Sequence, residues 1–145
     1  LFGGYDDDYL VGGDGDDKID GGSERDYISA GNGDDIIFGG DGFDVLRGQD
    51  GSDVFVFKAN ETGHDIIADF TKGQDQIDIS SYLSVVGVSS FDQAISEGYI
   101  SMQDAAIGVD IYFDEAALGE ENYENILFNL YGVLAADVDS TCFIA

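Results

Sequence analysis

The stretch from Gly3 to Val56 decides the fold, because it consists of six nonapeptides in unbroken register. They read GGYDDDYLV (3–11), GGDGDDKID (12–20), GGSERDYIS (21–29), AGNGDDIIF (30–38), GGDGFDVLR (39–47) and GQDGSDVFV (48–56). The sixth position is Asp in every copy: Asp8, Asp17, Asp26, Asp35, Asp44 and Asp53. The eighth position is always large and apolar: Leu10, Ile19, Ile28, Ile37, Leu46 and Phe55. Asp and Gly are common turn residues, but turn preference alone does not place one Asp in every nine residues, so the pattern indicates a repeated structural unit.

The glycines and the Asp of each unit supply the parts of a cation site. Glycine adopts positive φ without a steric penalty, so the first half of a unit can turn tightly and point several backbone carbonyls at one spot. The sixth-position Asp adds a carboxylate to that spot. Carboxylate and carbonyl oxygens suit a hard cation, and Ca²⁺ accepts about six to eight of them in flexible geometry. The repeat therefore predicts calcium binding.

The last three residues of each unit predict a short β-strand, with the apolar middle side chain on one face. A single unit cannot bury that side chain, so the units have to stack on one another. Two units, each a turn and a strand, then make one coil of a flattened right-handed helix with a thin aliphatic core. The predicted fold class is all-β: a right-handed parallel β-roll of nonapeptide repeats, capped by a C-terminal β-rich segment.

Stacking places the turns of alternate units on the same side of the roll. Asp8, Asp26 and Asp44 line one side, the odd ridge, and Asp17, Asp35 and Asp53 line the other, the even ridge. A cation between neighbouring coils would use two Asp side chains eighteen residues apart. Six copies give four such sites, so we expect about four or more calcium ions. The other ligands are expected from the turn residues Gly4, Gly13, Gly15, Gly22, Gly31, Gly33, Gly40, Gly42 and Gly51.

The first and third copies depart from the pattern. Asp6 and Glu24 replace the glycine at position four, and Tyr5 and Ser23 occupy position three. A non-glycine residue at positive φ is strained. We therefore expect the Asp8–Asp26 site to be the weakest, or to recruit Asp6 or Glu24 as an extra ligand.

Composition limits the class of protein. The chain has 145 residues, of which 31 are acidic and 5 basic, with a formal net charge of −26. Such a surface repels nucleic acid and anionic lipid, and bound divalent cations would offset its self-repulsion. No run of apolar residues is long enough to span a membrane. Cys142 is alone, so no intrachain disulfide is possible. Leu1 and Phe2 fit positions eight and nine of a further copy, which predicts a longer array.

Glycine content divides the chain into two expected domains. Residues 1–57 hold 14 of the 21 glycines and form the expected calcium-binding roll. Residues 58–145 form the expected C-terminal capping and secretion region. In the order of the sequence, strands are expected at 64–70, 76–80, 99–103, 108–113 and 126–131, a turn at 71–75, a helix at 91–97 capped by Ser90, an acidic loop at 114–124, and one helical turn or loop at 133–138.

The roll is expected to end at residues 54–57, which read as a longer strand than the repeats provide. The outward positions of the even copies become apolar toward this end, from Lys18 and Asp20 to Val54 and Val56. An apolar face does not stay exposed to water. We therefore expect the second half to dock on this face and cap the roll.

Residues 3–56 resemble the RTX β-roll. The continuation SDVFVF (52–57) and HDIIADFTKGQDQIDIS (64–80) is similar to the segment after the roll in serralysin-type metalloproteases and in the R-modules of alginate epimerases. The resemblance implies a calcium-binding module of a secreted, extracellular protein that leaves the cell through a type I secretion apparatus. It also implies an upstream domain in the same polypeptide, and a calcium-binding role for Asp65 with Glu61 as its partner.

The tail, residues 139–145, resembles the apolar end of such secretion signals, with Cys142 where Asp is common. In that reading the acidic chain stays unfolded at cytosolic calcium, is exported, and folds on meeting calcium outside. The module would thereby export and stabilise its upstream domain. The resemblance covers residues 1–82 well and the remainder loosely.

Catalysis is not predicted. One histidine, His64, cannot supply a zinc motif with two histidines, and the acidic residues are too regularly repeated to single out a general acid–base pair. A hydrogen-bonding role for His64 is favoured over a catalytic pair with Asp65.

The alternative function is an extracellular carbohydrate-binding or adhesin-terminal module. Tyr9 and Tyr27 lie on the same expected face, where they could stack on sugar rings, although a plain role on the sheet surface is favoured. The basic residues of the roll are few, which disfavours an anionic polysaccharide as the partner: Lys18, Arg25 and Arg47.

Overall fold

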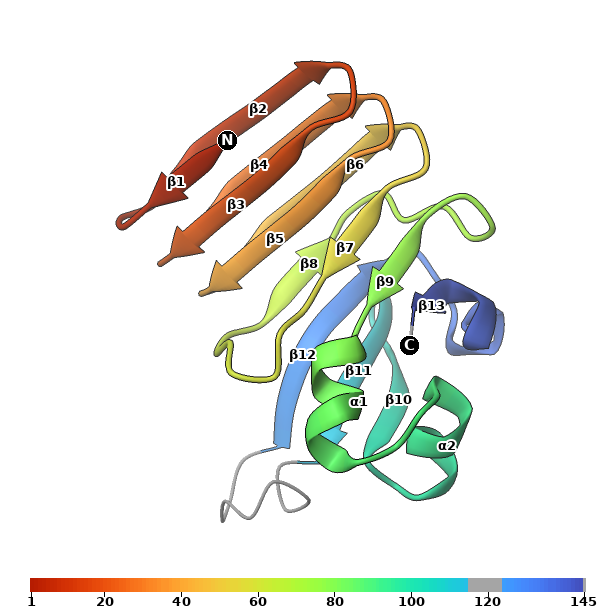
Figure 1. Cartoon of the computed structure of the whole chain (residues 1–145). Helices are drawn as coiled ribbons and strands as arrows, with labels where there is room; N and C mark the ends of the chain where they lie inside the picture. The colour runs from red at the N-terminus through yellow and green to blue at the C-terminus, as the bar shows by residue number, and fades with distance from the viewer. Residues whose placement is uncertain (115–123, 145) are drawn as a thin grey trace.

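The nonapeptides form the coils of a parallel β-roll in the computed structural model, which describes residues 1–114 and 124–144 (Figure 1). The roll begins with the strands β1 (Phe2–Gly4), β2 (Tyr9–Asp14), β3 (Lys18–Ser23), β4 (Tyr27–Asn32), β5 (Ile36–Asp41), β6 (Val45–Asp50) and β7 (Val54–Val56). Most strands have six residues rather than three, because they run on through the first three positions of the next copy. The paired glycines lie within these strands and pair across coils, as Gly13 does with Gly31.

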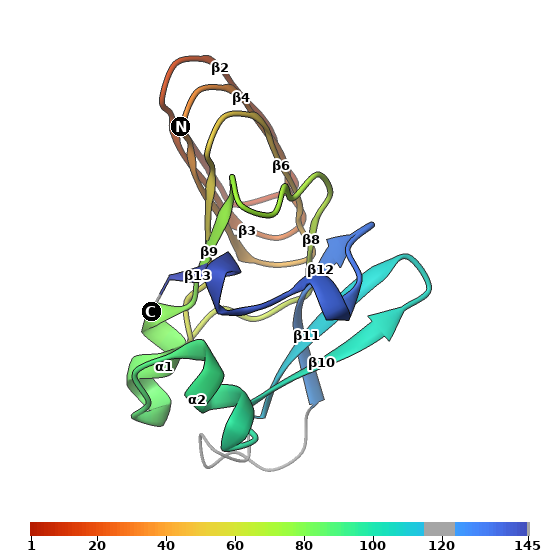
Figure 2. The ribbon, with the colours of Figure 1, turned by 90° about the vertical axis from the view of Figure 1, so that its right-hand side faces the viewer.

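Alternate strands belong to two different sheets. One contains β1, β3, β5 and β7, and the other contains β2, β4 and β6, all in parallel register. Each strand is aligned with the equivalent residues one coil away, so that Ile19 pairs with Ile37 and Ile28 with Leu46. Figure 2 looks along the roll and shows the coils superposed as flattened ovals. The predicted fold class is confirmed.

The core of the roll is the column of eighth-position side chains. Ile19, Ile28, Ile37, Leu46 and Phe55 are fully buried, and only Leu10 in the first coil is partly exposed. Burying one such side chain contributes about 1.5–3 kcal/mol. Because the two sheets enclose a single column, the core is thin and each coil depends on its neighbours.

We expected the roll to end at residues 54–57, but it continues beyond them. β8 (Asp65–Ile67) pairs in parallel with β6, and β9 (Gln76–Asp78) pairs in parallel with β7. Ile67 and Ile77 continue the buried column. Residues 60–68, NETGHDIIA, are thus a degenerate seventh copy, displaced by three inserted residues. β7 has three residues and is no longer than the other strands of its sheet.

The remaining elements cap the C-terminal end of the roll (Figure 1). They are α1 (Ser80–Val86), α2 (Phe91–Ser96), β10 (Ile100–Ala105), β11 (Gly108–Asp114), β12 (Glu124–Tyr131), the 3-10 turns η2 (Ala135–Asp137) and η3 (Ser140–Cys142), and β13 (Phe143–Ile144). β12 adds to the roll in parallel beside β8, and β11 and β10 follow it antiparallel. β13 adds in parallel beside β9, so both sheets of the roll continue into the cap.

Aromatic pairs join the cap to the roll and to its own helices. Phe57 stacks on Phe128 with ring centroids 4.3 Å apart, and Phe91 of α2 stacks on Phe143 at 3.8 Å. Tyr82 of α1 is buried and donates a hydrogen bond to the carbonyl of Tyr99. Offset ring pairs of this kind contribute about 0.5–1.5 kcal/mol beyond their buried area.

The expected elements of the second half are largely present, with one exception. The helix at 91–96 begins at Ser90, whose hydroxyl accepts from the Gln93 N–H, and the expected strands and the turn at 71–75 all form. Helix α1 was not predicted: its N-cap residue, Ile79, has no side chain that can cap the helix, and the Ser80 N–H donates instead to Asp78 Oδ1 at 2.9 Å. Residues 115–123 of the expected acidic loop lie outside the described residues.

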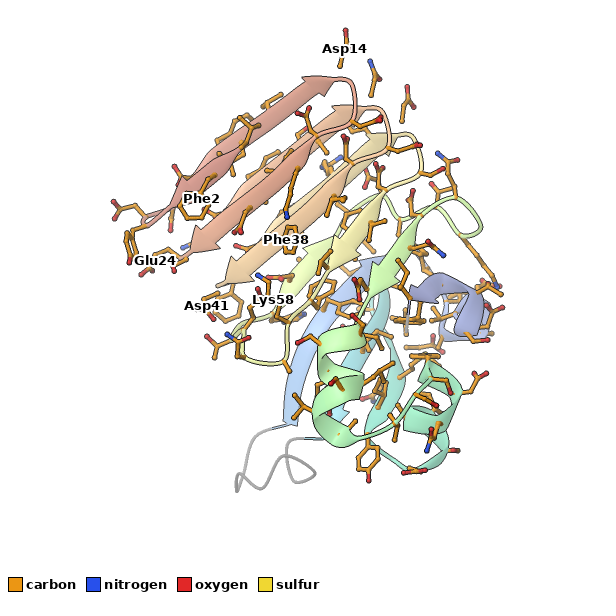
Figure 3. All side chains as sticks on the ribbon, viewed as in Figure 1. Phe2, Asp14, Glu24, Phe38, Asp41 and Lys58 are labelled. Atoms are coloured by element: carbon orange, nitrogen blue, oxygen red, sulfur yellow. The ribbon has the colours of Figure 1, made fainter. Side chains whose placement is uncertain are left out.

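The second half caps the roll, as expected, but it does so at the end of the sheets, and the outward face of the even copies stays partly exposed, so the predicted docking face was wrong. Ile36 on this face is 40% exposed. Phe38 is covered by two lysine side chains, with Lys18 Nζ 5.0 Å and Lys58 Nζ 4.7 Å from its ring centroid (Figure 3). The cap extends the two sheets at the end of the roll because the backbone groups of β8 and β9 require partners there, and β12 and β13 supply them. No helix in the described part of the chain is long and apolar enough to cross a membrane.

Candidate metal centre

The odd ridge contains a ladder of aspartates joined by backbone hydrogen bonds. The N–H of Asp8 donates to Oδ1 of Asp26 at 2.9 Å, and the N–H of Asp26 donates to Oδ1 of Asp44 at 2.8 Å. Asp44 in turn donates to Oδ1 of Asp65 at 2.9 Å. The carboxylates of Asp26, Asp44 and Asp65 therefore each have one oxygen fixed toward the preceding coil.

The even ridge repeats this arrangement on the opposite side of the roll. The N–H of Asp17 donates to Asp35 Oδ1 at 2.8 Å, and Asp35 donates to Asp53 Oδ1 at 3.0 Å. The ladder ends where Asp53 donates to Oδ1 of Asp75 at 3.2 Å. Figure 3 shows the two sides by the labelled Asp14 at one ridge and Glu24 and Asp41 at the other.

The second carboxylate oxygen of most of these residues is buried and has no hydrogen-bond partner in the described part of the chain. This holds for Oδ2 of Asp8, Asp26, Asp35, Asp44 and Asp53. Four of the ladder residues are only 1% exposed: Asp26, Asp35, Asp44 and Asp53. Burying a polar atom without a hydrogen-bond partner destabilises the fold by about 1–3 kcal/mol, and by more when the atom is charged. A regular column of such oxygens is the arrangement expected of ligands for bound cations.

Burial raises the pKa of these carboxyls. The pKa values of Asp44 and Asp53 are raised to about 6, in each case first by burial and then by neighbouring carboxylates. The pKa of Asp65 is raised to about 8 by burial and by the charge of Asp44. Asp26 and Asp35 shift in the same direction for the same reasons. Removing an oxygen from water disfavours its charged form, and so does a like charge nearby.

The glycine turns bring backbone carbonyls to the same places. All nine predicted turn glycines adopt positive φ: Gly4, Gly13, Gly15, Gly22, Gly31, Gly33, Gly40, Gly42 and Gly51. The turns stack so closely that a Cβ on Gly31 would meet the carbonyl of Gly13, and one on Gly40 would meet that of Gly22. A side chain in these positions would fill the space between turns. The space is therefore lined by carbonyl oxygen because only glycine permits the approach.

Three non-glycine residues also adopt positive φ in these turns. Asp6 and Glu24 do so at position four, with φ of 74° and 80°, and Gln49 does so at position two, with φ of 73°. This confirms the expected strain in the first and third copies, since an L-residue there costs about 1–2 kcal/mol. The side chains of Asp6 and Glu24 are exposed.

The donor set suits calcium better than a transition metal. Among the described residues, no three His, Cys, Asp or Glu side chains form a cluster that could hold a metal. A cation between two turns would instead combine two carboxylates with backbone carbonyl oxygens. Hard oxygen ligands without nitrogen or sulfur, in a flexible loop, are the donors that Ca²⁺ prefers. The residues present therefore fit the ion that the repeat predicts.

Asp65 occupies position six of the degenerate seventh copy. The Gly42 N–H donates to the Thr62 carbonyl at 2.8 Å, just as Gly33 donates to Asp50 in the even ridge. Asp65 is 5% exposed. Gly63 and Asp65 preserve the x-Gly-x-Asp signature of the repeats in the segment TGHD, residues 62–65. That signature, shifted by three residues, is the signal by which the sequence could have revealed the seventh turn.

Two acidic residues were missed. Asp75 is 3% exposed and closes the even ladder, and Asp69 accepts hydrogen bonds from the N–H groups of Gly48 and Gln49. Neither lies in a nonapeptide, so the repeat gives no signal for them. The other candidate, His64, has a buried Nε2 without a hydrogen-bond partner in the described part of the chain.

Comparison with known proteins agrees with this geometry. Residues 2–37 and 29–59 match the family model of the RTX calcium-binding nonapeptide repeat (4 copies). The solution structure of the AlgE6R2 subunit of the Azotobacter vinelandii mannuronan C5-epimerase is similar in fold, with a TM-score of 0.56 and 20% sequence identity over 94% of this chain and 90% of that one. The AlgE6R3 subunit of the same epimerase is 22% identical over 90% of this chain and 78% of that one, with a TM-score of 0.29. No curated protein sequence matches the chain.

Proposed function

We propose that this module, whose residues 2–59 match the family model of the RTX calcium-binding nonapeptide repeat, folds when Ca²⁺ fills its turns. The observation that carries the proposal is the column of buried, unpartnered Oδ2 atoms on both ridges. Without a cation these like charges destabilise the stacked coils. With a cation in each gap between turns they become ligands, and the same stacking becomes favourable.

The proposed ligands are the aspartates of both ladders within the repeats, with Asp65 and the turn carbonyls beside them. Extracellular calcium modules bind with Kd values of about 10⁻⁴–10⁻³ M. A site whose Kd is tenfold below the ambient calcium contributes roughly 1.4 kcal/mol, so four contribute about 5–6 kcal/mol. This is comparable to the whole stability of a small domain, about 5–15 kcal/mol. At cytosolic calcium the same sites contribute almost nothing.

This difference between compartments supports a role in secretion. We assign residues 1–57, together with the seventh turn that holds Asp65, to calcium binding, and the remainder of residues 58–145 to capping and type I secretion. The chain stays unfolded in the cell, passes through the secretion apparatus, and folds outside, where it stabilises an upstream domain of the same secreted polypeptide. The module is not itself catalytic in this proposal. Its high negative charge keeps the calcium-free chain extended, because like charges repel.

The experiment is circular dichroism of the chain in a calcium chelator, followed by addition of millimolar Ca²⁺. We expect little β-structure before addition and the full β signal after it, with magnesium unable to substitute. A fully folded calcium-free protein at low salt would contradict the proposal.

A second candidate is carbohydrate binding, and the arrangement of two tyrosines favours it. The rings of Tyr9 and Tyr27 stack with centroids 4.9 Å apart and planes at 4°, and Tyr9 is 70% exposed. Arg47 Cζ lies 6.0 Å from the Tyr27 centroid. Titration with neutral and anionic polysaccharides in calcium, with Tyr9→Ala and the control Tyr131→Ala, tests it. Binding that only Tyr9→Ala abolishes would support a carbohydrate-binding or adhesin role.

A further inference from the structure

The two ridges end differently at the C-terminal side of the roll. The last turn of the odd ridge, residues 60–65, keeps the glycine turn: Gly63 has φ of 138° and lies against the carbonyl of Gly42. The last turn of the even ridge, residues 69–75, reads DFTKGQD and has no glycine pair at its start. The turn at residues 69–75 is instead joined to the preceding coil by hydrogen bonds of its side chains.

Asp75 differs from the ladder residues below it because both of its carboxylate oxygens accept hydrogen bonds. Oδ1 accepts from the Asp53 N–H at 3.2 Å, and Oδ2 accepts from the Thr71 N–H at 2.7 Å. The Asp75 N–H also donates to the Thr71 carbonyl at 2.9 Å, which closes the loop on itself. In Asp35 and Asp53 the equivalent Oδ2 has no partner. Both Asp75 oxygens therefore already accept a backbone hydrogen bond, which makes Asp75 a poorer cation ligand than the repeat aspartates.

Two further side chains of this turn satisfy backbone groups of the coil below. The Gln74 side-chain amide donates to the carbonyl of Gly51, a turn carbonyl of the kind that would face a cation. Asp69 accepts from the Gly48 N–H at 3.1 Å and from the Gln49 N–H at 3.2 Å. An amide N–H occupies one of the two lone pairs of a carbonyl oxygen, which leaves one for any metal ion.

At the end of the odd ridge the carboxylates of Asp44 and Asp65 converge instead. A Cβ placed on Gly39 would lie 2.6 Å from Oδ2 of Asp44 and 2.9 Å from Oδ2 of Asp65, so both oxygens face one point. Asp44 Oδ2 is buried and unpartnered. Nothing equivalent to the Gln74 amide or the Thr71 N–H accompanies Asp65 among the described hydrogen bonds, and this end remains open to a cation.

We propose that the calcium ladder ends asymmetrically: Asp65 is the last ligand of the odd ridge, whereas Asp75 is a positioning residue that closes the even ridge by hydrogen bonds and binds no ion. This inference rests on the proposed calcium-binding function. It means that the turn at residues 69–75 terminates one row of ions with protein donors, while the other row continues for one more site.

Native mass spectrometry of the whole chain in calcium, together with its melting temperature, tests the inference. The variants are Asp65→Asn and Asp75→Asn. Asp50→Asn is the control, because Asp50 is exposed and its substitution removes one negative charge, as the other two do. We expect Asp65→Asn to bind one ion fewer than the unmodified chain. Asp75→Asn and Asp50→Asn keep the full number of ions. Asp75→Asn also melts lower by roughly 3–10 °C, since the Asn amide cannot accept from both N–H groups.

The outcomes separate the two proposals. An unmodified chain that retains no calcium refutes the calcium-binding function. An unmodified chain that binds calcium, with Asp75→Asn one ion short, refutes only the asymmetric ending, as does Asp65→Asn with an unchanged number. If Asp75→Asn does not fold, Gln74→Ala replaces it, because Gln74 is exposed and its loss leaves Asp75 intact. Gln74→Ala is expected to keep the full number of ions, and a loss of one ion would again refute the inference.

Discussion

The backbone N–H of Asp44 donates a 2.9 Å hydrogen bond to Oδ1 of Asp65, across an interval of 21 residues. Within the repeats the same bond spans 18 residues, as from Asp26 to Asp44. Three residues are inserted before the seventh turn, yet the bond is kept. The ladder therefore follows the stacking of coils rather than the count of residues, and it extends the candidate metal centre beyond the nonapeptides.

Replacing a ladder carboxylate should weaken calcium-dependent folding. Asp26→Asn keeps an oxygen for the Asp8 N–H but removes the charge from a residue that is 1% exposed. We expect the calcium concentration at half-folding to rise several-fold, since one lost site corresponds to about 1.4 kcal/mol at tenfold excess. A calcium titration followed by circular dichroism measures this, and the exposed Asp50→Asn is the control. Equal midpoints for both variants would show that Asp26 is not a ligand.

Turn glycines that face another turn should not tolerate a side chain. Gly31 has φ of 125°, and a Cβ there would meet the Gly13 carbonyl. Gly73 also has positive φ, at 82°, but a Cβ there meets nothing within 4 Å. Gly73→Ala should therefore cost only about 1–2 kcal/mol of backbone strain, and Gly31→Ala clearly more. Urea unfolding in calcium compares them, and equal losses would contradict the close stacking of turns.

The calcium-free roll should gain stability in acid. The pKa values of Asp44 and Asp53 are raised to about 6 and that of Asp65 to about 8, above the ordinary 3.8. A carboxyl whose pKa is higher in the folded state stabilises the fold at low pH, and this contribution is lost as pH rises through the folded value. Stability should therefore fall as pH rises from about 4 to about 8.

Circular dichroism of the chain, freed of calcium on a chelating resin and measured across this pH range, checks the direction: the β signal should be larger near pH 4 than near pH 8. With calcium present the dependence should reverse, because protons then compete with the ion for the same oxygens. A calcium-free protein that is most stable at about pH 8 would contradict the burial of these carboxyls.

Neighbouring isoleucines should differ sharply. Ile37 is fully buried in the column between the sheets, whereas Ile36 is 40% exposed on the outer face. Ile37→Ala should cost about 2–5 kcal/mol, through lost burial and the cavity left behind. Ile36→Ala should cost much less. Urea unfolding in saturating calcium measures both, and similar losses would mean that the eighth position is not the core of the roll.

The sequence by itself determined the repeated part of this protein. An Asp, an apolar residue and a glycine turn at fixed positions in nine residues predict the strand, the buried column and the two ridges, because each unit needs its neighbours to bury its apolar side chain. The candidate ligands Asp8 to Asp53 follow from the same period. Local rules also identified the helix capped by Ser90, since a capping serine is a short-range signal.

Only the tertiary structure decided how the segments after residue 57 are arranged around the roll. Asp65 and Asp75 join the two ladders across 21 and 22 residues, and neither interval is a multiple of nine. The cap extends the ends of both sheets rather than covering their outward face, because unpaired strand edges require hydrogen-bond partners. Contacts between coils decide which carboxylate oxygens accept a hydrogen bond and which have no partner. Those contacts form only when the chain is stacked, so a repeat read along the sequence cannot specify them.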